Sequence, residues 1–251
     1  MKIVVSPDKT VLGKAAADAG TAAIRASLET KGKATIVVAT GTSQIDTLDA
    51  LVNMTDIDWS CVDAFHLDEY IGLPASHPAS FRRYLNDRFV TRLPRLRGFT
   101  AINGCTANVD AELKRLNGLL RDRTVDVCFA GIGENGHLAF NDPPADFQTD
   151  QPYLRVELDE ACRRQQFDEG WFPTIEAVPR EAISMSIAQI MKSQTLILSV
   201  PDLRKARAVK GAVHGGVTAM LPASIAQRHP QCTLFLDPAS ASGLGNAPES
   251  P

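Results

Sequence analysis

The amino-acid sequence predicts an α/β fold, a single-domain, three-layer α/β/α sandwich around a mostly parallel, Rossmann-like sheet. Three observations predict it: short β-branched runs recur along the chain, segments with helical periodicity separate them, and no linker divides the chain before residue 240. Strands that alternate with helices pair in parallel, and the helices then cover both faces of the sheet. A composition that is 44% hydrophobic is sufficient for such a core.

The predicted strands are six short runs, at residues 3–5, 35–38, 62–65, 125–129, 195–200 and 233–236. Two of the segments between them have apolar residues at helical spacing. The first stripe, within residues 44–54, consists of Ile45, Leu48, Leu51 and Val52, and the second of Leu113, Leu116, Leu119 and Leu120. We expect both stripes to lie in the core.

One domain, residues 1–241, accounts for this pattern. The sequence has no internal repeat with a period of about 20 to 50 residues, the range typical of repeat proteins. Residues 242–251, which are rich in Gly, Pro and Ser, have the composition of a disordered tail.

Charge and the amino terminus restrict the partners and the location. The chain has 26 Lys and Arg against 29 Asp and Glu, so no basic excess points to nucleic acid or to an anionic membrane. The first ten residues lack the long apolar stretch of a signal peptide, and no run approaches the ~20 apolar residues that span a bilayer. We therefore expect a cytoplasmic protein, and the sequence leaves a homo-oligomer open.

The five cysteines are odd in number and widely separated, and none forms a C-x-x-C pair. This pattern argues against zinc sites and disulfide frameworks. We expect reduced, mostly buried thiols and no bound metal.

The turn at residues 39–43 follows the second predicted strand and opens the next helix. Ligands of open parallel sheets bind beyond the carboxyl ends of the strands. The backbone N–H groups and hydroxyls around Gly41, Thr42 and Ser43 suit a phosphate. No Gly-Lys-Ser/Thr is present, which excludes a nucleotide P-loop. A plain helix N-cap by Thr42 or Ser43 is the alternative interpretation.

Two adjacent carboxylates, Asp68 and Glu69, follow the third predicted strand. Neighbouring side chains on extended backbone point in opposite directions, so only one of the pair should face a given pocket. A carboxylate held out of bulk water can abstract a proton from a carbon beside a carbonyl group. A solvated acidic turn is the alternative.

The glycine-rich turn at residues 131–137 follows the fourth predicted strand. Gly131, Gly133 and Gly136 satisfy the dinucleotide fingerprint G-x-G-x-x-G. That fingerprint requires a helix to follow, whereas Asn-Asp-Pro-Pro comes within a few residues. We therefore expect no dinucleotide cofactor at this turn.

His137 ends the same turn, with Asn135 and Asp142 close by in the sequence. A lone histidine is more often structural, but a histidine bracketed by glycines and these polar neighbours is a candidate for acid/base catalysis. Further along, residues 204–207 place basic side chains at the start of a helix, where the macrodipole does not favour cations. Lys205 is therefore a candidate anion ligand, and a solvated helix face is the alternative.

Three motifs together resemble the glucosamine-6-phosphate deaminase family: H-L-D-E-Y-I-G-L-P at 66–74, G-I-G-E-N-G-H-L-A-F-N-D-P at 131–143 and R-K-A at 204–206. The resemblance extends from the turn at residue 39 to about residue 237. It implies the fold shared by sugar-phosphate isomerases and 6-phosphogluconolactonases. It also implies conversion of glucosamine 6-phosphate to fructose 6-phosphate and ammonia, with a sugar phosphate as partner and no cofactor.

The resemblance also implies roles for individual residues. Asp68 matches the base that moves a proton between C2 and C1, and His137 matches the histidine that assists opening of the pyranose ring. Asp142 stands where better-known members have a glutamate that supports this histidine, and it is one methylene shorter. Asn135 stands where members have aspartate or asparagine.

Phosphate binding is implied for the turn Gly41, Thr42 and Ser43 and for Lys205. In the family an arginine from a mobile region contacts the phosphate, and this region matches poorly here at residues 159–172. Either Arg163 or Arg164 could serve. We also expect Glu69 and Gly136 to contact the substrate.

Three other interpretations remain open from the sequence. A 6-phosphogluconolactonase shares the fold, but that family resembles D-E-R after the acidic strand and lacks the run Phe140 to Pro143. A deaminase or isomerase acting on a different hexosamine 6-phosphate fits every motif. A catalytically silent sugar-phosphate sensor would keep the pocket without the chemistry, although retention of both Asp68 and His137 favours an enzyme.

Overall fold

The structure is a computed structural model that describes residues 1–245 of the 251-residue chain. Seven strands form one sheet in the order β1-β10-β9-β6-β2-β3-β5, and every neighbouring pair is parallel. The strands are β1 (Lys2–Val5), β2 (Ala34–Val38), β3 (Val62–His66), β5 (Gly98–Thr100), β6 (Val127–Ala130), β9 (Thr195–Val200) and β10 (Cys232–Leu236). The predicted parallel sheet and all six predicted strands are confirmed, and β5 is an additional strand.

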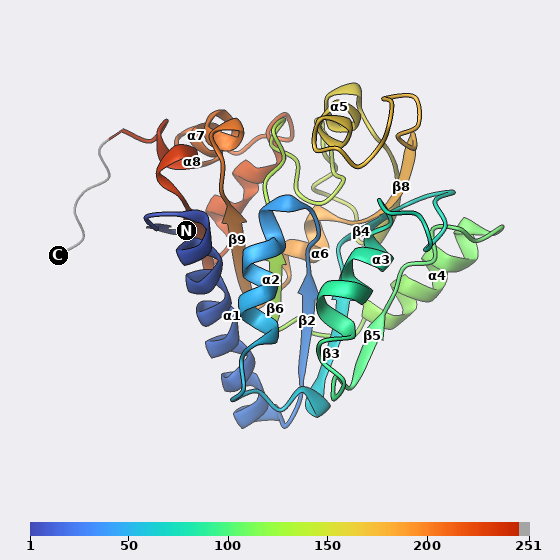
Figure 1. The fold of residues 1–251 in the computed structure, drawn as a ribbon, viewed down its shortest axis with the longest axis vertical. Coiled ribbons are helices and arrows are strands. Elements are labelled where there is room, and N and C mark those ends of the chain that lie inside the picture. The colour runs from blue at the N-terminus through green and yellow to red at the C-terminus, as the bar shows by residue number, and fades with distance from the viewer. Residues whose placement is uncertain (246–251) are drawn as a thin grey trace.

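Helices cover both faces of this sheet, so the predicted three layers are confirmed (Figure 1). The helices α1 (Lys9–Lys31), α2 (Ile45–Val52) and α3 (Phe81–Leu85) contribute to one core cluster, and α4 (Val109–Leu120), α6 (Ile187–Met191) and α7 (Ala206–His214) to the other. Strand residues alternate between the clusters: Ile36 and Val38 belong to the first and Val37 to the second. This alternation is the period of two that a strand buried on both faces requires.

The long helix α1 lies directly against the sheet. Asp8 caps its amino end by accepting a hydrogen bond from the Val11 N–H group, and Gly32 ends it in the left-handed conformation, with φ 68°. A Cβ atom at Gly20 would lie 2.2 Å from the Phe129 ring. The glycine therefore permits the close approach of helix and sheet.

A second, three-stranded antiparallel sheet stands beyond the carboxyl ends of the parallel strands. Its order is β4 (Asp68–Tyr70), β8 (Glu181–Met185) and β7 (Tyr153–Glu157). In Figure 1 it lies with α5 (Glu160–Asp168) at the end of the molecule to which the arrowheads of β2 and β9 point. A third apolar cluster, rich in aromatic residues, packs against it: Tyr70, Leu73, Ala79, Phe81, Phe140, Leu158, Cys162, Phe172, Val178 and Ala182. The sequence analysis did not predict this sheet.

Two expectations about burial need correction. Leu119 is 38% exposed, so it does not belong to the core stripe of α4 with Leu116 and Leu120, because it lies about 60° around the helix from Leu116 and about 100° from Leu120. In the expected tail, residues 242–245 follow α8 (Pro238–Ala241), and Leu244 packs against the core. The rest of that tail, residues 246–251, lies outside the described residues.

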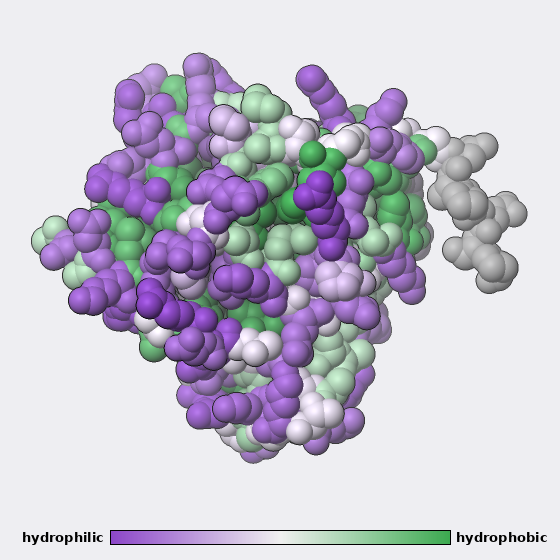
Figure 2. Space-filling model, turned by 180° about the vertical axis from the view of Figure 1, so that it is seen from behind, coloured by the Kyte–Doolittle hydropathy of each residue, from purple (hydrophilic) through white to green (hydrophobic). Residues whose placement is uncertain are grey.

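The surface of the molecule is mainly polar. Figure 2 shows the side opposite to that of Figure 1, where hydrophilic side chains dominate and apolar residues lie among them. None of the helices in residues 1–245 combines the length and apolar character that a membrane-spanning helix requires. All five cysteines are free, and Cys128, Cys162 and Cys232 are buried, as expected for mostly buried thiols.

Candidate active site

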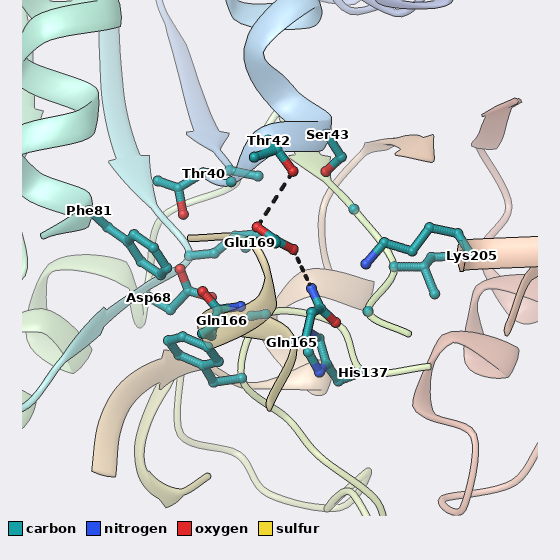
Figure 3. A pocket seen from close by; sticks show the side chains of 18 residues that line it. Thr40, Thr42, Ser43, Asp68, Phe81, His137, Gln165, Gln166, Glu169 and Lys205 are labelled. Carbon is teal, nitrogen blue, oxygen red and sulfur yellow. Dashed lines mark hydrogen bonds between the residues drawn. The ribbon is translucent and has the colours of Figure 1, made fainter. Parts of the chain in front are cut away.

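A cavity lined by nine polar side chains lies at the carboxyl ends of the central strands (Figure 3). The turn after β2, the residues after β3, the loop after β6 and the short helix after β9 all contribute to it. The lining residues are Ala39, Thr40, Gly41, Thr42, Ser43, Leu67, Asp68, Phe81, Gly131, Ile132, Gly133, His137, Ala139, Phe140, Gln165, Gln166, Glu169 and Lys205. Parallel strands end at the same edge of a sheet, which is why residues far apart in the sequence meet here.

Asp68 begins β4 and faces this pocket. Its side chain is buried, with 6% of the residue exposed, and accepts no hydrogen bond from any of residues 1–245. Burial, with a smaller contribution from the charge of Glu69, raises the pKa of Asp68 to about 8. When ionised, this carboxylate is therefore a stronger base than an ordinary aspartate, as a proton acceptor from carbon needs to be.

Glu69 lies on the other face of β4 and does not line the pocket. It is fully buried, and its carboxylate accepts hydrogen bonds from the Ser80 hydroxyl (2.8 Å) and from the backbone N–H groups of Phe81 (3.2 Å) and Arg82 (2.9 Å). The Arg82 guanidinium lies 3.4 Å away. The expected substrate contact of Glu69 is thus wrong, because the carboxylate is used to hold the start of α3.

His137 lines the pocket and is held from behind by Asp142. The His137 Nδ1 atom lies 3.0 Å from Asp142 Oδ1, so the shorter aspartate does reach the histidine. Burial opposes ionisation of Asp142, but the hydrogen bonds from His137, Asn135 and the Asp159 N–H group outweigh it and lower the pKa of Asp142. With Nδ1 donating to this carboxylate, neutral His137 keeps Nε2 free to accept a proton.

Asn135 and Gly136 support this arrangement without lining the pocket. The Asn135 amide donates to Asp142 (2.9 Å), and its oxygen accepts from the His137 N–H group (3.0 Å). Gly136 has φ 87°, and a Cβ atom there would lie 2.3 Å from Leu221. The expected substrate contact of Gly136 is therefore corrected to a turn that only glycine fits. Asn135 and Asp142 orient the histidine.

The turn after β2 and the helix after β9 form the other end of the pocket. Gly41, Thr42 and Ser43 line it, and Gly41 has φ 93° and accepts a hydrogen bond from the Tyr84 hydroxyl. Lys205 lies in the short 3-10 helix Leu203–Lys205 and is only 5% exposed. Burial lowers the pKa of Lys205, and no carboxylate of residues 1–245 lies within ion-pair distance of it. A buried, unpaired ammonium group beside exposed N–H groups favours an anionic ligand.

Helix α5 covers the pocket with residues that the sequence analysis missed. Gln165, Gln166 and the helix-ending Glu169 all line it, and Gln165 Nε2 donates to Glu169 Oε1 at 2.9 Å. Gln166 Oε1 accepts from the Tyr70 hydroxyl at 2.7 Å. These residues were missed because α5 is not at a strand end; the signal available was a pair of adjacent glutamines inside an amphipathic segment.

Neither candidate arginine of this region reaches the pocket. The Arg163 guanidinium donates to the backbone oxygens of Ile175 (2.7 Å) and Val178 (3.3 Å), and so fixes the loop that follows α5. Arg164 is exposed and lies over the Phe167 ring, 5.9 Å from its centroid. Arg163 and Arg164 therefore lie outside the lining of the pocket, and the phosphate contact expected of one of them stays a prediction.

One group within residues 1–245 has ligand atoms close enough to share a metal ion: His137, Asp142 and Cys162, all within 4.8 Å of one another. The hydrogen bond between His137 and Asp142 explains their approach without an ion. Burial raises the pKa of Cys162 well above its usual range, with further contributions from Asp142 and Asp159. A protonated thiol is a poor metal ligand, so these residues fit a metal badly.

Comparison with known proteins gives a consistent result. The model of the family described as glucosamine-6-phosphate isomerases/6-phosphogluconolactonase matches residues 7–235. A glucosamine-6-phosphate deaminase of Lactobacillus delbrueckii subsp. bulgaricus is 35% identical over 244 residues, which cover 97% of this chain and 100% of the relative.

Solved structures agree with this match. A monomeric glucosamine-6-phosphate deaminase superposes with a TM-score of 0.87 at 29% identity, covering 97% of this chain and 100% of the other. A 6-phosphogluconolactonase from Shewanella baltica has a TM-score of 0.78 at 20% identity, covering 94% and 97%, and at that identity it shares the fold alone. The matched length, the fold and the pocket together show that the chain belongs to the glucosamine-6-phosphate isomerase/6-phosphogluconolactonase family.

Proposed function

We propose that this chain is a glucosamine-6-phosphate deaminase, which converts glucosamine 6-phosphate and water into fructose 6-phosphate and ammonia without a cofactor. The observation that carries the proposal is that one pocket joins a buried, unpartnered carboxyl, an oriented imidazole and a buried ammonium group, from Asp68, His137 and Lys205. The full-length similarity to deaminases supports the same substrate.

Ring opening is the first step of this reaction. His137 Nε2 takes the proton of the C1 hydroxyl and returns a proton to the ring oxygen, which gives the open-chain aldehyde. Asp142 accepts the hydrogen bond from Nδ1 throughout, so it holds the ring orientation and stabilises the transient imidazolium. This is the same division of work that a carboxylate and a histidine have in other proton-transfer sites.

Proton transfer between carbons is the second step. Asp68 removes the proton from C2 and delivers it to C1, while a proton of the amino group passes to O1, so that the aldehyde carbon becomes a hydroxymethyl group and C2 becomes an imine. Water then adds to C2, and ammonia leaves with the electron pair of the C–N bond, which gives the ketose. The raised pKa of Asp68 supports this role, because a carboxylate near pKa 8 holds the abstracted proton more strongly than an ordinary one.

The phosphate group is assigned to the opposite end of the pocket. The N–H groups and hydroxyls of Thr42 and Ser43 are suitable donors to its oxygens, and Lys205 supplies the charge. These contacts would persist from the bound substrate to the transition state, so they serve affinity more than rate.

A silent sensor is less consistent with this pocket. Burying a carboxyl without a hydrogen-bond partner destabilises a protein, and a pure binding site has no use for it. Lactone hydrolysis likewise needs no base positioned for a carbon-bound proton.

We also propose a cytoplasmic location, which the five free cysteines support because thiols stay reduced in that compartment.

The test is ammonia release by the purified protein, with glucosamine 6-phosphate, galactosamine 6-phosphate and 6-phosphogluconolactone assayed in parallel. We expect release from glucosamine 6-phosphate without added metal or nucleotide and after treatment with a chelator. The galactosamine arm resolves which hexosamine is preferred. Lactone hydrolysis without ammonia release from either amino sugar would contradict the proposal.

A further inference from the structure

The phosphate end of the pocket already contains an anion of the protein itself. Glu169 follows α5, and its Oε2 atom lies 3.5 Å from the Thr42 hydroxyl oxygen. Figure 3 shows the Glu169 carboxylate between Thr42 and the side chains of Gln165 and His137, on the side towards which Lys205 extends. The donors that suit a phosphate therefore face a carboxylate in the present conformation.

The contacts of Glu169 come mainly from its own segment. Gln165 Nε2 donates to its Oε1 atom at 2.9 Å, and Trp171 Nε1 donates to its Oε2 atom at 3.2 Å. Both donors are neutral, and Thr42 is the contact to the sheet side of the pocket. Only the weak bond to Thr42 ties the Glu169 carboxylate to the sheet side. The helix before it stays in place, because Gln165 accepts from the Glu134 N–H group at 2.9 Å and Gln166 from the Tyr70 hydroxyl at 2.7 Å, so the displacement is one of the Glu169 side chain.

There is also space beside the pocket for a displaced carboxylate. A second hollow adjoins the pocket and shares Thr42, Ser43, Glu169 and Lys205 with it. Its remaining wall includes two cations, Lys9 and Arg204, and three carboxylates, Asp168, Asp202 and Asp237. Glu169 stands at the boundary between the two hollows, so a rotation of its side chain carries the carboxylate away from a bound phosphate and into the second hollow.

A phosphate monoester carries a charge of about -1.5 to -2 at neutral pH. Such an anion on Thr42, Ser43 and Lys205 would lie beside the Glu169 carboxylate, and like charges at this separation repel strongly in a water-poor site. We infer that Glu169 is an internal anion that occupies the phosphate position of the empty enzyme, and that the phosphate group of the substrate must displace it. The residue thereby selects phosphorylated sugars, because a neutral sugar carries no charge that would repel the Glu169 carboxylate from this position.

This inference rests on the proposed function only for the phosphate group, so the test uses inorganic phosphate as its probe. Glu169→Gln keeps the shape of the side chain and removes the charge, and Glu160→Gln, on the exposed start of the same helix, is the matched control. We expect calorimetry to show the Kd for inorganic phosphate falling at least about tenfold in Glu169→Gln and unchanged in the control, since juxtaposed like charges cost several kcal/mol.

An unchanged or weaker affinity of Glu169→Gln for inorganic phosphate would overturn the inference. A second measurement does not depend on that variant. The chain has two tryptophans, so Trp59→Phe leaves Trp171 as the reporter beside Glu169. Its emission should shift when inorganic phosphate is added, and an unchanged emission at saturating phosphate also contradicts the displacement.

The two proposals can fail separately. If Glu169→Gln binds phosphate more tightly but the protein releases no ammonia from any amino sugar, the inference about Glu169 holds and the proposed deaminase function is wrong. If the protein releases ammonia but Glu169→Gln gains no phosphate affinity, the deaminase function holds and the inference about Glu169 is wrong.

Discussion

The neighbouring carboxylates of strand β4, Asp68 and Glu69, lie on its two faces in opposite environments. Asp68 faces the pocket with no hydrogen-bond donor among the described residues, whereas Glu69, directed into the protein, accepts bonds from Ser80, Phe81 and Arg82. Both side chains are buried. Burial alone therefore does not set the role of a carboxylate: the supply of donors makes one residue structural, and its absence leaves the other basic and available for chemistry.

The largest effect is expected on the pocket face. Asp68→Asn keeps the size of the side chain and removes the base, so turnover should fall about 10² to 10⁴-fold, which is the usual contribution of positioned acid/base catalysis. Ammonia release and solvent-deuterium exchange at C2 measure it. Exchange at C2 that continues at the normal rate would break the comparison, because Asp68 would then not be the base.

On the opposite face of β4, we expect a substitution of Glu69 to lower the stability of the protein. Glu69→Gln exchanges an acceptor oxygen for an NH₂ group that points at existing donors and leaves Arg82 without its partner. We expect a loss of about 3 kcal/mol in the free energy of unfolding, the lower range for a broken buried charge pair. Urea denaturation measures it, with Glu29→Gln on the exposed side of α1 as the control. A variant as stable as this control would show that the hydrogen bonds do not matter.

A third expected effect is a pH dependence of protein stability, caused by the ionisation of Asp68. The pKa of Asp68 is raised in the folded state to about 8, so the folded protein binds this proton more tightly than the unfolded chain, and the stability of the protein falls as pH rises towards 8. Asp68→Asn cannot ionise. We expect the variant to melt at least about 2 to 4 °C above the parent at pH 8, the shift that roughly 1 kcal/mol causes in a chain of this size, and to match it closely at pH 4. Equal differences at both pH values would place the cause outside this ionisation.

The parallel sheet could be predicted because its strands are continuous apolar runs. The strand β5 (Gly98–Thr100) is only three residues long and half-buried throughout, so it carries no such run. In the small sheet, Arg155 and Glu157 alternate with more buried residues along β7, which is a period-two signal that a search for apolar runs overlooks. Strand β4, which pairs with β8, was not predicted as a separate strand because it begins two residues after β3 ends.

The candidate site likewise contains residues that could be predicted from the sequence and residues that could not. Asp68, His137 and Lys205 could be placed in one pocket because each follows a strand of the parallel sheet. Glu169 could not, because it belongs to a helix whose position depends on the packing of the small sheet. The sequence also could not show whether Arg163 or Arg164 faces the pocket. Which way each side chain points depends on the orientation of α5, and spacing in the sequence alone does not determine that orientation.

The aromatic cluster around Tyr70 is separate from the two cores that pack on the parallel sheet. It joins the small sheet and α5, and Phe81 and Phe140 from it also line the pocket. A unit with its own apolar contacts can open without global unfolding. Amide hydrogens of α5 and of residues 171–178 should therefore exchange with solvent as one cooperative group, faster than those of β2 and β6, and each such opening would expose the Asp68 carboxyl to bulk water.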